Sequence, residues 1–440
     1  MVRPAAPTIF AVATPPGRSA IAVFRLSGPS SSRALELLTN AATPPARQAA
    51  LRWLTAPGSG ERIDQALVTF FPAPHSYTGE DLLEIGVHGG RAVVAALAEI
   101  LQAFPGIKPA EPGEFTRRAF QNGKLDLTQA EGIADLIDSE TEFQRRQALR
   151  VASGGLREKV AQWREIALQI AAELESQLDF SDEGDVGEND FRLAASWRRN
   201  LEVQLQEELR NGERSGRLRN GISIVLAGPP NAGKSTLFNG LVGMERAIVS
   251  AHPGTTRDLL YADIDIEGFP VTLIDSAGLR ESGDDIEQIG MDRARAAVEA
   301  ADIVLWLNAH DAVAEPVVGD RRFLRVWTKA DLGQPAPAGW MELDCRSSAD
   351  LHRLVESIVP ILGSLAGDGA EGLVLRSRQR DAVGKGVDAC DRLGAHLATG
   401  NIELAAEECR VVLDALESLG GGVDIEDILG EVFGRFCIGK

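Results

Sequence analysis

The chain has 440 residues, of which 44% are hydrophobic and 25% charged, a composition typical of a globular protein with roughly two to four domains. A formal net charge of −19 argues against a broad basic nucleic-acid surface, so any RNA contact must use local arginine clusters. Four scattered cysteines and six unpaired histidines argue against a zinc site or a disulfide framework. The sequence also lacks a signal-peptide pattern and any apolar run of membrane-spanning length, so we expect a cytoplasmic protein with no membrane partner.

Residues 1–122 contain short apolar runs bounded by proline, glycine and serine clusters. The runs predict strands at Ile9–Thr14, Ala20–Leu26, Leu67–Phe71 and Leu82–His88, and the segments between them predict helices at Ser31–Thr39 and Arg91–Ala103. This mixture indicates an α+β amino-terminal domain.

Residues 123–216 contain no proline and have helical periodicity, which predicts the first segment of an all-α domain. Thr128 and Glu131 have the spacing of a capping box at a helix start. Longer helical stretches are expected from Glu142 to Phe180 and from Phe191 to Leu209, with an acidic break between them.

Residues 217–373 alternate strands and helices, which is typical of an α/β domain with a largely parallel sheet. The expected strands are Ile222–Leu226, Leu260–Ile266, Val271–Ile274, Ile303–Leu307 and Leu324–Trp327. Residues 374–440 become helical again, with helices expected at Ala382–Leu397, Glu403–Leu419 and Asp424–Phe433. Because this tail has little core of its own, we expect it to pack on the first helical segment, which makes the α/β domain an insertion.

The segment Gly228–Ser235 fits the pattern G-x-x-x-x-G-K-[ST] between an expected strand and an expected helix. Its glycines allow backbone amides to point at a β-phosphate, beside the positive end of the helix. Lys234 supplies a charge to the β- and γ-phosphate oxygens, and Ser235 supplies a hydroxyl to Mg²⁺. This P-loop predicts nucleotide binding.

Four further elements follow in the order typical of a GTPase. Asp275–Gly278 ends a strand where an Asp reaches the Mg²⁺ shell, and Thr256 in the preceding polar loop can complete the coordination. Asp331 can accept hydrogen bonds from the guanine ring N–H and exocyclic amine, which adenine does not offer. Ser347 and its neighbours supply a backbone contact to the guanine oxygen. The expected GTP contacts are Asn231, Ala232, Gly233, Lys234, Ser235, Thr236, Ser250, Thr255, Thr256, Asp275, Ser276, Ala277, Gly278, Thr328, Lys329, Asp331, Ser347 and Ser348.

Two positions depart from the usual GTPase motifs. Thr328 stands where Asn is usual in Asn-Lys-x-Asp, and its shorter side chain predicts weaker guanine affinity. Leu279 stands where Ras-type enzymes have a water-orienting Gln, so another group must orient water.

Several motifs together resemble the MnmE (TrmE) family of tRNA modification GTPases. They are Ala13–Arg18, Ser76–Asp81, His88–Gly90, Pro112–Phe115, Lys124–Leu127, the P-loop with Asn231, Gly254–Asp258, Asp275–Arg280 and the terminal Phe436–Lys440. The resemblance covers essentially the whole chain and implies the same three-part fold.

The resemblance implies a homodimer whose G domains pair across GTP when potassium is bound, which stimulates hydrolysis. By this resemblance K⁺ is held by Asn231, Ser250, His252 and Thr255. Glu287 takes the water-orienting role, so the expected catalytic residues are Glu287, Lys234 and Asn231.

The resemblance also implies a 5-formyltetrahydrofolate site in the amino-terminal domain, lined by Arg25, Glu84, Lys124 and the terminal Lys440. Judged from the residues alone, Arg25 and Glu84 form an ion pair between neighbouring strands. Cys437 belongs to the terminal motif and is a candidate functional thiol.

The implied function is potassium-dependent GTP hydrolysis together with an FAD- and NADH-dependent partner of the MnmG (GidA) type. The pair adds a carboxymethylaminomethyl or aminomethyl group at C5 of the wobble uridine of certain tRNAs. A ribosome-assembly GTPase, an ATP-using P-loop enzyme and a non-hydrolysing scaffold remain as alternatives. Folate binding, competition between GTP and ATP, and the position of Glu287 distinguish them.

Overall fold

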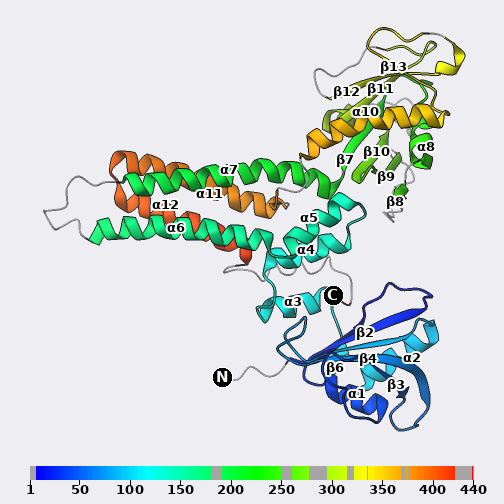
Figure 1. The fold of residues 1–440 in the computed structure, drawn as a ribbon, viewed down its shortest axis with the longest axis vertical. Helices are drawn as coiled ribbons and strands as arrows, with labels where there is room; N and C mark the ends of the chain where they lie inside the picture. The colour runs from blue at the N-terminus through cyan, green and yellow to red at the C-terminus, as the bar shows by residue number, and fades with distance from the viewer. Residues whose placement is uncertain are drawn as a thin grey trace, which may run out of the picture. The chain divides into compact units, whose positions relative to one another are not determined.

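The computed structural model describes residues 6–179, 191–244, 246–248, 260–276, 295–314, 322–333, 335–367, 372–374, 376–421 and 439 (Figure 1). The chain divides into two compact units, Met1–Ala134 with Glu417–Lys440, and Asp135–Leu416. Among the helices in the described ranges, none is both long and apolar enough to cross a membrane.

The amino-terminal part is a six-stranded sheet covered on one face by two helices. Its strand order is β3-β4-β5-β2-β1-β6, antiparallel except for the parallel β1–β6 pair. The elements are β1 (Thr8–Val12), β2 (Ile21–Ser27), α1 (Ser31–Thr39), β3 (Ala50–Thr55), β4 (Arg62–Phe71), β5 (Leu82–His88), α2 (Arg91–Ala103), β6 (Ile107–Pro109) and α3 (Glu114–Gln121). Apolar side chains of α1 and α2 form one buried cluster with those of the central strands. The expected bounds of α1, α2 and β5 are confirmed, whereas β3, β6 and α3 were not anticipated.

The helical part is built from two chain segments. Its helices are α4 (Leu127–Ile137), α5 (Glu142–Ala152), α6 (Gly155–Asp179), α7 (Arg192–Asn220), α11 (Ser377–Thr399) and α12 (Ile402–Gly420). The guanidinium of Arg198 on α7 donates to the carbonyl of Cys390 on α11 at 3.3 Å, and the thiol of Cys409 on α12 donates to the carbonyl of Ala167 on α6 at 3.3 Å. The second segment therefore packs on the first, as expected.

The capping box at the start of α4 lies two residues earlier than the sequence pattern suggested. Asp126 Oδ1 accepts from the backbone N–H of Gln129 at 2.8 Å, and Gln129 Oε1 accepts from the N–H of Asp126 at 3.2 Å. Thr128 instead lies in the first turn, where its hydroxyl donates to Asp126 Oδ1. Asp caps as well as Thr does, and it precedes the first helical residue.

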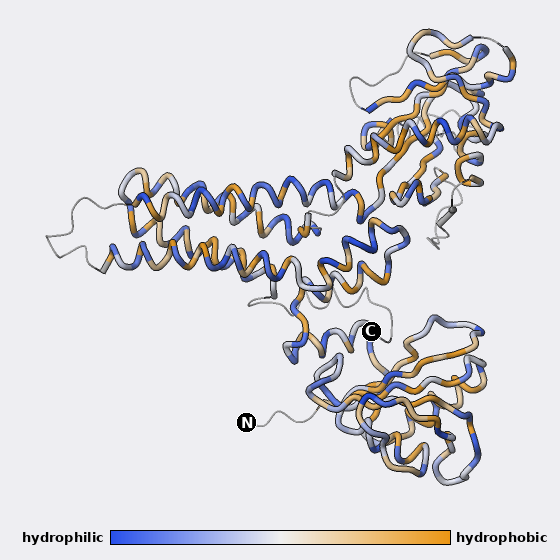
Figure 2. The backbone as a smooth tube through the Cα atoms, viewed as in Figure 1, coloured by the Kyte–Doolittle hydropathy of each residue, from blue (hydrophilic) through white to orange (hydrophobic). Residues whose placement is uncertain are grey.

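The inserted G domain is a seven-stranded sheet in the order β13-β12-β11-β7-β10-β9-β8. Its elements are β7 (Ile222–Ala227), α8 (Lys234–Met244), β8 (Arg246–Ile248), β9 (Leu260–Ile266), β10 (Phe269–Asp275), β11 (Ile303–Asn308), β12 (Phe323–Thr328), the 3₁₀ turn η1 (Ala330–Leu332), β13 (Met341–Leu343) and α10 (Ser348–Ala366). Strands β13 to β10 are parallel, and β9 and β8 are antiparallel additions at one edge. The hydrophobic colouring of these strands in Figure 2 agrees with burial on both faces, as expected for a parallel sheet.

The chain passes between the helical part and the G domain twice. It enters at the end of α7, directly before β7, and returns through Leu373 and Val374 to α11. The fully buried carboxylate of Glu208 on α7 accepts from the N–H groups of Leu373 at 2.6 Å and of Val374 at 3.1 Å. These bonds satisfy the two backbone N–H groups of the segment that returns from the G domain. The prediction that the α/β domain is inserted between two helical segments is confirmed.

Candidate functional site

The P-loop connects the end of β7 to the start of α8. Gly228 has φ +142°, and a Cβ there would lie 2.1 Å from the carbonyl oxygen of Leu307, so only glycine fits beside β11. Asn231 and Gly233 have φ values of +65° and +86°, which curl the loop back toward the helix. Asn231 is exposed at the outside of this curl, whereas Ala232 is fully buried beneath it.

Lys234 is almost fully buried inside the loop. Its Nζ donates to the carbonyl oxygens of Gly228 and Pro229, each at 2.8 Å. A cation held by backbone carbonyls at a helix N-terminus is placed to exchange them for phosphate oxygens. The position of Lys234 therefore fits the phosphate role predicted from the motif.

A hydroxyl and a carboxylate meet beside the loop. The Ser235 hydroxyl donates to Asp275 Oδ2 at 2.7 Å, and Asp275 is fully buried at the end of β10. The parallel register pairs Asp275 with Leu226, which puts the ends of β10 and β7 side by side. Both groups offer the oxygen ligands that Mg²⁺ prefers, so the pair fits a magnesium site.

Thr328 contacts the protein backbone at the end of β12. Its buried hydroxyl lies 2.8 Å from the carbonyl oxygen of Ala232 in the P-loop and 3.2 Å from that of Asn308 at the end of β11. The hydroxyl therefore joins the P-loop to the neighbouring strand ends. The sequence motif predicts only that Thr328 contacts guanine, so this contact with the P-loop was not anticipated.

The expected guanine-reading residues follow β12 and β13, which are adjacent parallel strands. Asp331 is exposed in η1, and Ser347 caps α10 by accepting from the N–H of Asp350 at 3.4 Å. The thiol of Cys345 lies between them in the chain. Burial is the main cause that raises the pKa of Cys345 to about 12, and the nearby carboxylates of Asp344 and Asp331 add to it. Because β12 and β13 are adjacent parallel strands, the loops that carry Asp331 and Ser347 begin side by side.

Lys329 has a left-handed backbone, with φ +59°. Its Nζ lies 2.7 Å from both carboxylate oxygens of Asp311. This hydrogen bond is the main cause that lowers the pKa of Asp311. Ser276, at the end of β10, donates its hydroxyl to the carbonyl of Leu226 at 2.7 Å.

The other predicted nucleotide contacts lie at the two helix starts or outside the described residues. Thr236 and Ser348 are exposed at the starts of α8 and α10. Seven of the predicted G-domain residues lie outside the described residues, namely Ser250, His252, Thr255, Thr256, Ala277, Gly278 and Glu287.

A second candidate site lies on the amino-terminal sheet. Arg25 on β2 faces Glu84 on β5, and its Nη2 and Nε lie 2.7 and 3.1 Å from Glu84 Oε1. The predicted ion pair between neighbouring strands is therefore present. The guanidinium also lies 5.8 Å from the ring centroid of Tyr77, whose hydroxyl is 2.8 Å from that of Thr116. Burial is the main cause that raises the pKa of Tyr77.

The penultimate residue of the chain reaches this ion pair. Arg25 Nη1 donates to the carbonyl oxygen of Gly439 at 3.4 Å. Gly439 has φ +107°, and a Cβ there would lie 2.8 Å from the carbonyl of Val12, so the terminus runs close against β1. Tyr77 and Gly439 were missed from the sequence because neither is near Arg25 along the chain. Lys124 is exposed and donates to the carbonyl of Pro74 at 3.1 Å, and Cys437 and Lys440 lie outside the described residues.

Comparison with known proteins covers the whole chain. The family model "GTP-binding protein TrmE N-terminus" matches residues 8–124, and the model "MnmE helical domain" matches residues 127–437. A tRNA modification GTPase MnmE from Beijerinckia indica is 46% identical over 435 residues, which are 98% of this chain and 96% of that protein. The MnmE of Rhodopseudomonas palustris strain CGA009 is 44% identical over 446 residues and covers 100% of both chains.

Among solved structures, the G domain of the T. maritima FeoB iron transporter matches 32% of this chain and 98% of its own length. It has 22% sequence identity and a TM-score of 0.25, so the assignment rests on the sequence relatives. The matches over nearly the full length confirm the resemblance carried by the P-loop and the terminal motifs. The chain belongs to the tRNA modification GTPase MnmE family.

Proposed function

We propose that this protein is a potassium-dependent GTPase that acts in tRNA modification as a homodimer. With an FAD- and NADH-dependent partner of the MnmG (GidA) type, it adds a carboxymethylaminomethyl or aminomethyl group at C5 of the wobble uridine. The observation that carries the proposal is a P-loop whose Ser235 hydroxyl is hydrogen-bonded to Asp275. It lies in a chain of which 98% is matched by a tRNA modification GTPase.

In the nucleotide site, Lys234 binds the β- and γ-phosphates and Ser235, with Thr256, holds Mg²⁺. Asn231 is exposed on the outer curve of the loop, which suits contact with a cation at the phosphates. The K⁺ ligands are Asn231, Ser250, His252 and Thr255. Glu287 orients the attacking water, because the apolar Leu279 cannot do so.

The amino-terminal site would hold 5-formyltetrahydrofolate, which supplies a one-carbon unit when bound. Glu84 accepts from N–H groups of the pterin ring, as carboxylates do in paired hydrogen bonds. Its Oε1 accepts from Arg25, and the Glu84 side chain is 32% exposed, so a ligand can reach the carboxylate. Lys124, Lys440 and Cys437 complete the proposed site.

A homodimer is supported by apolar side chains on the sheet face that α1 and α2 leave uncovered. Ile21, Leu51, Trp53 and Leu67 are 62, 58, 45 and 52% exposed. Leu51 and Leu67 are cross-strand partners on β3 and β4, so the apolar side chains are adjacent. A second copy of the same sheet can bury them, as a symmetric interface requires.

The test is the GTP hydrolysis rate of the purified protein in KCl and in NaCl at equal ionic strength, with Asn231→Ala and Glu287→Ala alongside. We expect a large stimulation that is specific for potassium and is lost in both variants. A rate that does not depend on the cation would refute the potassium mechanism and leave a GTPase of another type.

A further inference from the structure

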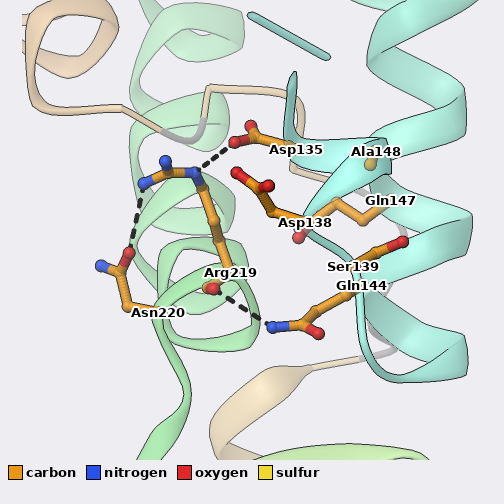
Figure 3. A pocket seen from close by; sticks show the side chains of 8 residues that line it. All are labelled: Asp135, Asp138, Ser139, Gln144, Gln147, Ala148, Arg219 and Asn220. Carbon is orange, nitrogen blue, oxygen red and sulfur yellow. Dashed lines mark hydrogen bonds and ion pairs between the residues drawn. The ribbon is translucent and has the colours of Figure 1, made fainter. Parts of the chain in front are cut away.

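The α4–α5 segment, residues 127–152, contacts both chain connections to the G domain through one carboxylate. Asp135 Oδ1 accepts from Arg219 Nε at 2.9 Å and from Arg376 Nη2 at 2.8 Å. Figure 3 shows the guanidinium of Arg219 directed at Asp135 across a small pocket. All three side chains are largely buried, with exposed fractions of 11% for Asp135, 29% for Arg219 and 16% for Arg376. The contact is therefore partly shielded from water.

The two arginines mark the ends of the inserted domain. Arg219 lies in the last turn of α7, three residues before β7, the strand that leads into the P-loop. Arg376 is the N-cap residue of α11, which follows the return from the G domain. One carboxylate thus holds the chain where it enters the G domain and where it leaves.

The same segment makes two further contacts, one with the end of α7 and one with the G domain. Gln144 Nε2 donates to the carbonyl oxygen of Arg219 at 3.3 Å (Figure 3). The ring of Phe143 stacks on Phe269, with centroids 4.4 Å apart and an interplanar angle of 21°. Phe269 is the first residue of β10, and Asp275, which faces the magnesium position, is the last. Through Phe269 the strand that ends at Asp275 is therefore in direct contact with α5.

This junction is polar and incompletely packed. Asp135, Gln144, Gln147 and Arg219 line a pocket of about 100 Å³. Gln147 is 2% exposed, and its Nε2 has no hydrogen-bond partner among the described residues. Polar contacts exchange with water at little net cost, whereas a close-packed apolar core resists displacement. Such a junction can adopt a second arrangement.

We infer that Asp135 is a positioning residue that couples the nucleotide state of the G domain to the helical domain. In this account it transmits GTP hydrolysis to the modification step and does not contribute to hydrolysis itself. The inference rests on the proposed function, because its readout is modification per GTP consumed.

The test compares Asp135→Asn with wild type and with the control Glu142→Gln. Glu142 also binds two arginines, Arg145 and Arg146 at 2.7 Å each, but all three lie on α5, and among the described residues no hydrogen bond or ion pair links them to the G domain. The measurements are GTP affinity, hydrolysis rate, and modified wobble uridine formed per GTP hydrolysed. For Asp135→Asn we expect affinity and hydrolysis within about twofold of wild type, and a roughly tenfold lower modification yield per GTP. Asp135→Glu should recover part of the yield, and Glu142→Gln should match wild type.

An unchanged yield per GTP in Asp135→Asn would overturn the inference. A parallel loss of GTP affinity, GTP hydrolysis and modification in Asp135→Asn would also overturn it, because that result would show that Asp135 only stabilises the fold. Wild-type protein that hydrolyses GTP without modifying tRNA would refute the proposed function instead.

A second measurement does not depend on catalysis. Spin labels at Val203 on α7 and Arg353 on α10, both exposed, report the distance between the helical domain and the G domain. The wild-type distance should differ between GDP and a GTP analogue, and that difference should shrink in Asp135→Asn. Equal nucleotide dependence in both proteins, or none in wild type, would contradict the coupling.

Discussion

The nucleotide site and the amino-terminal site are built in opposite ways. The P-loop places its functional groups within eight consecutive residues, and its backbone is fixed by glycine geometry and by bonds to its own carbonyls. The amino-terminal site joins Arg25, Glu84, Tyr77 and Gly439, which come from separate strands, a loop and the chain end. A contiguous site can be recognised from a short motif, whereas a dispersed site depends on the completed fold.

The two sites also differ in what a ligand must displace. In the proposed nucleotide site, Lys234 would exchange the neutral carbonyl oxygens of Gly228 and Pro229 for phosphate oxygens, which would strengthen its hydrogen bonds. Glu84 already accepts from a guanidinium, so a ligand must share or replace a charged partner. We therefore expect substitutions in the P-loop to have larger effects than those on the sheet.

The largest effect is expected for Lys234→Ala. Removing the ammonium abolishes charge-assisted bonds to the phosphates, so GTP affinity should fall by roughly a hundredfold or more. Titration with a fluorescent GTP analogue measures this, and folate binding to the same variant serves as the control. A loss below about threefold would show that Lys234 does not bind phosphate.

Glu84→Gln tests the sheet site. The amide cannot accept the same pair of bonds from a pterin, so the affinity for 5-formyltetrahydrofolate should fall by about tenfold while GTP hydrolysis stays unchanged. Calorimetric titration measures the affinity. Glu36→Gln is a matched control, because Glu36 pairs with Arg33 on the exposed face of α1. Equal folate affinity in both variants would exclude Glu84 from the site.

Thr328→Val is expected to weaken GTP binding by about five- to tenfold. The substitution keeps the shape but leaves the buried carbonyl of Ala232 without its donor, which costs about 1 kcal/mol or more. Thr328→Ser retains the hydroxyl and should bind GTP almost as wild type does. If Thr328→Val and Thr328→Ser bind GTP equally well, the Thr328 hydroxyl does not position the P-loop.

The smallest effect is expected for Asp311→Asn. Because Lys329 lowers the pKa of Asp311 in the folded state, the pair contributes stability above the unfolded pKa of Asp and loses it as the pH falls through the lowered value. The variant should have a slightly lower Tm than wild type at pH 7, and this difference should shrink as the pH is lowered. Thermal unfolding of both proteins at pH 7 and at acid pH measures this. A Tm difference that grows as the pH falls would contradict the predicted direction of the pKa shift of Asp311.

The sequence predicted the elements whose signals are local. The bounds of α1, α2, β5 and β9 follow from apolar periodicity and from flanking turn residues. Strand β3 was missed, because Leu51 and Trp53 are exposed on it and its register depends on pairing with β4. The cap of α4 was misplaced because Asp126 and Thr128 are each followed three residues later by a residue that can complete a capping box, Gln129 and Glu131.

The candidate sites divide in the same way. The P-loop could be predicted because a strand, a loop and a helix in sequence fix its geometry. Asp275 could be predicted because it ends another strand in the motif order of a GTPase. The contact of Thr328 with Ala232 spans 96 residues, and that of Arg25 with Gly439 spans 414. Such contacts depend on strand order and on the docked chain end, which a single sequence does not specify.

The most direct test of the central claim is nucleoside analysis of tRNA from cells that lack their own GTPase of this family. We predict that the wild-type chain restores carboxymethylaminomethyl- or aminomethyluridine at the wobble position and that Lys234→Ala does not. Unmodified wobble uridine in cells that produce the folded wild-type chain together with the partner would contradict the account.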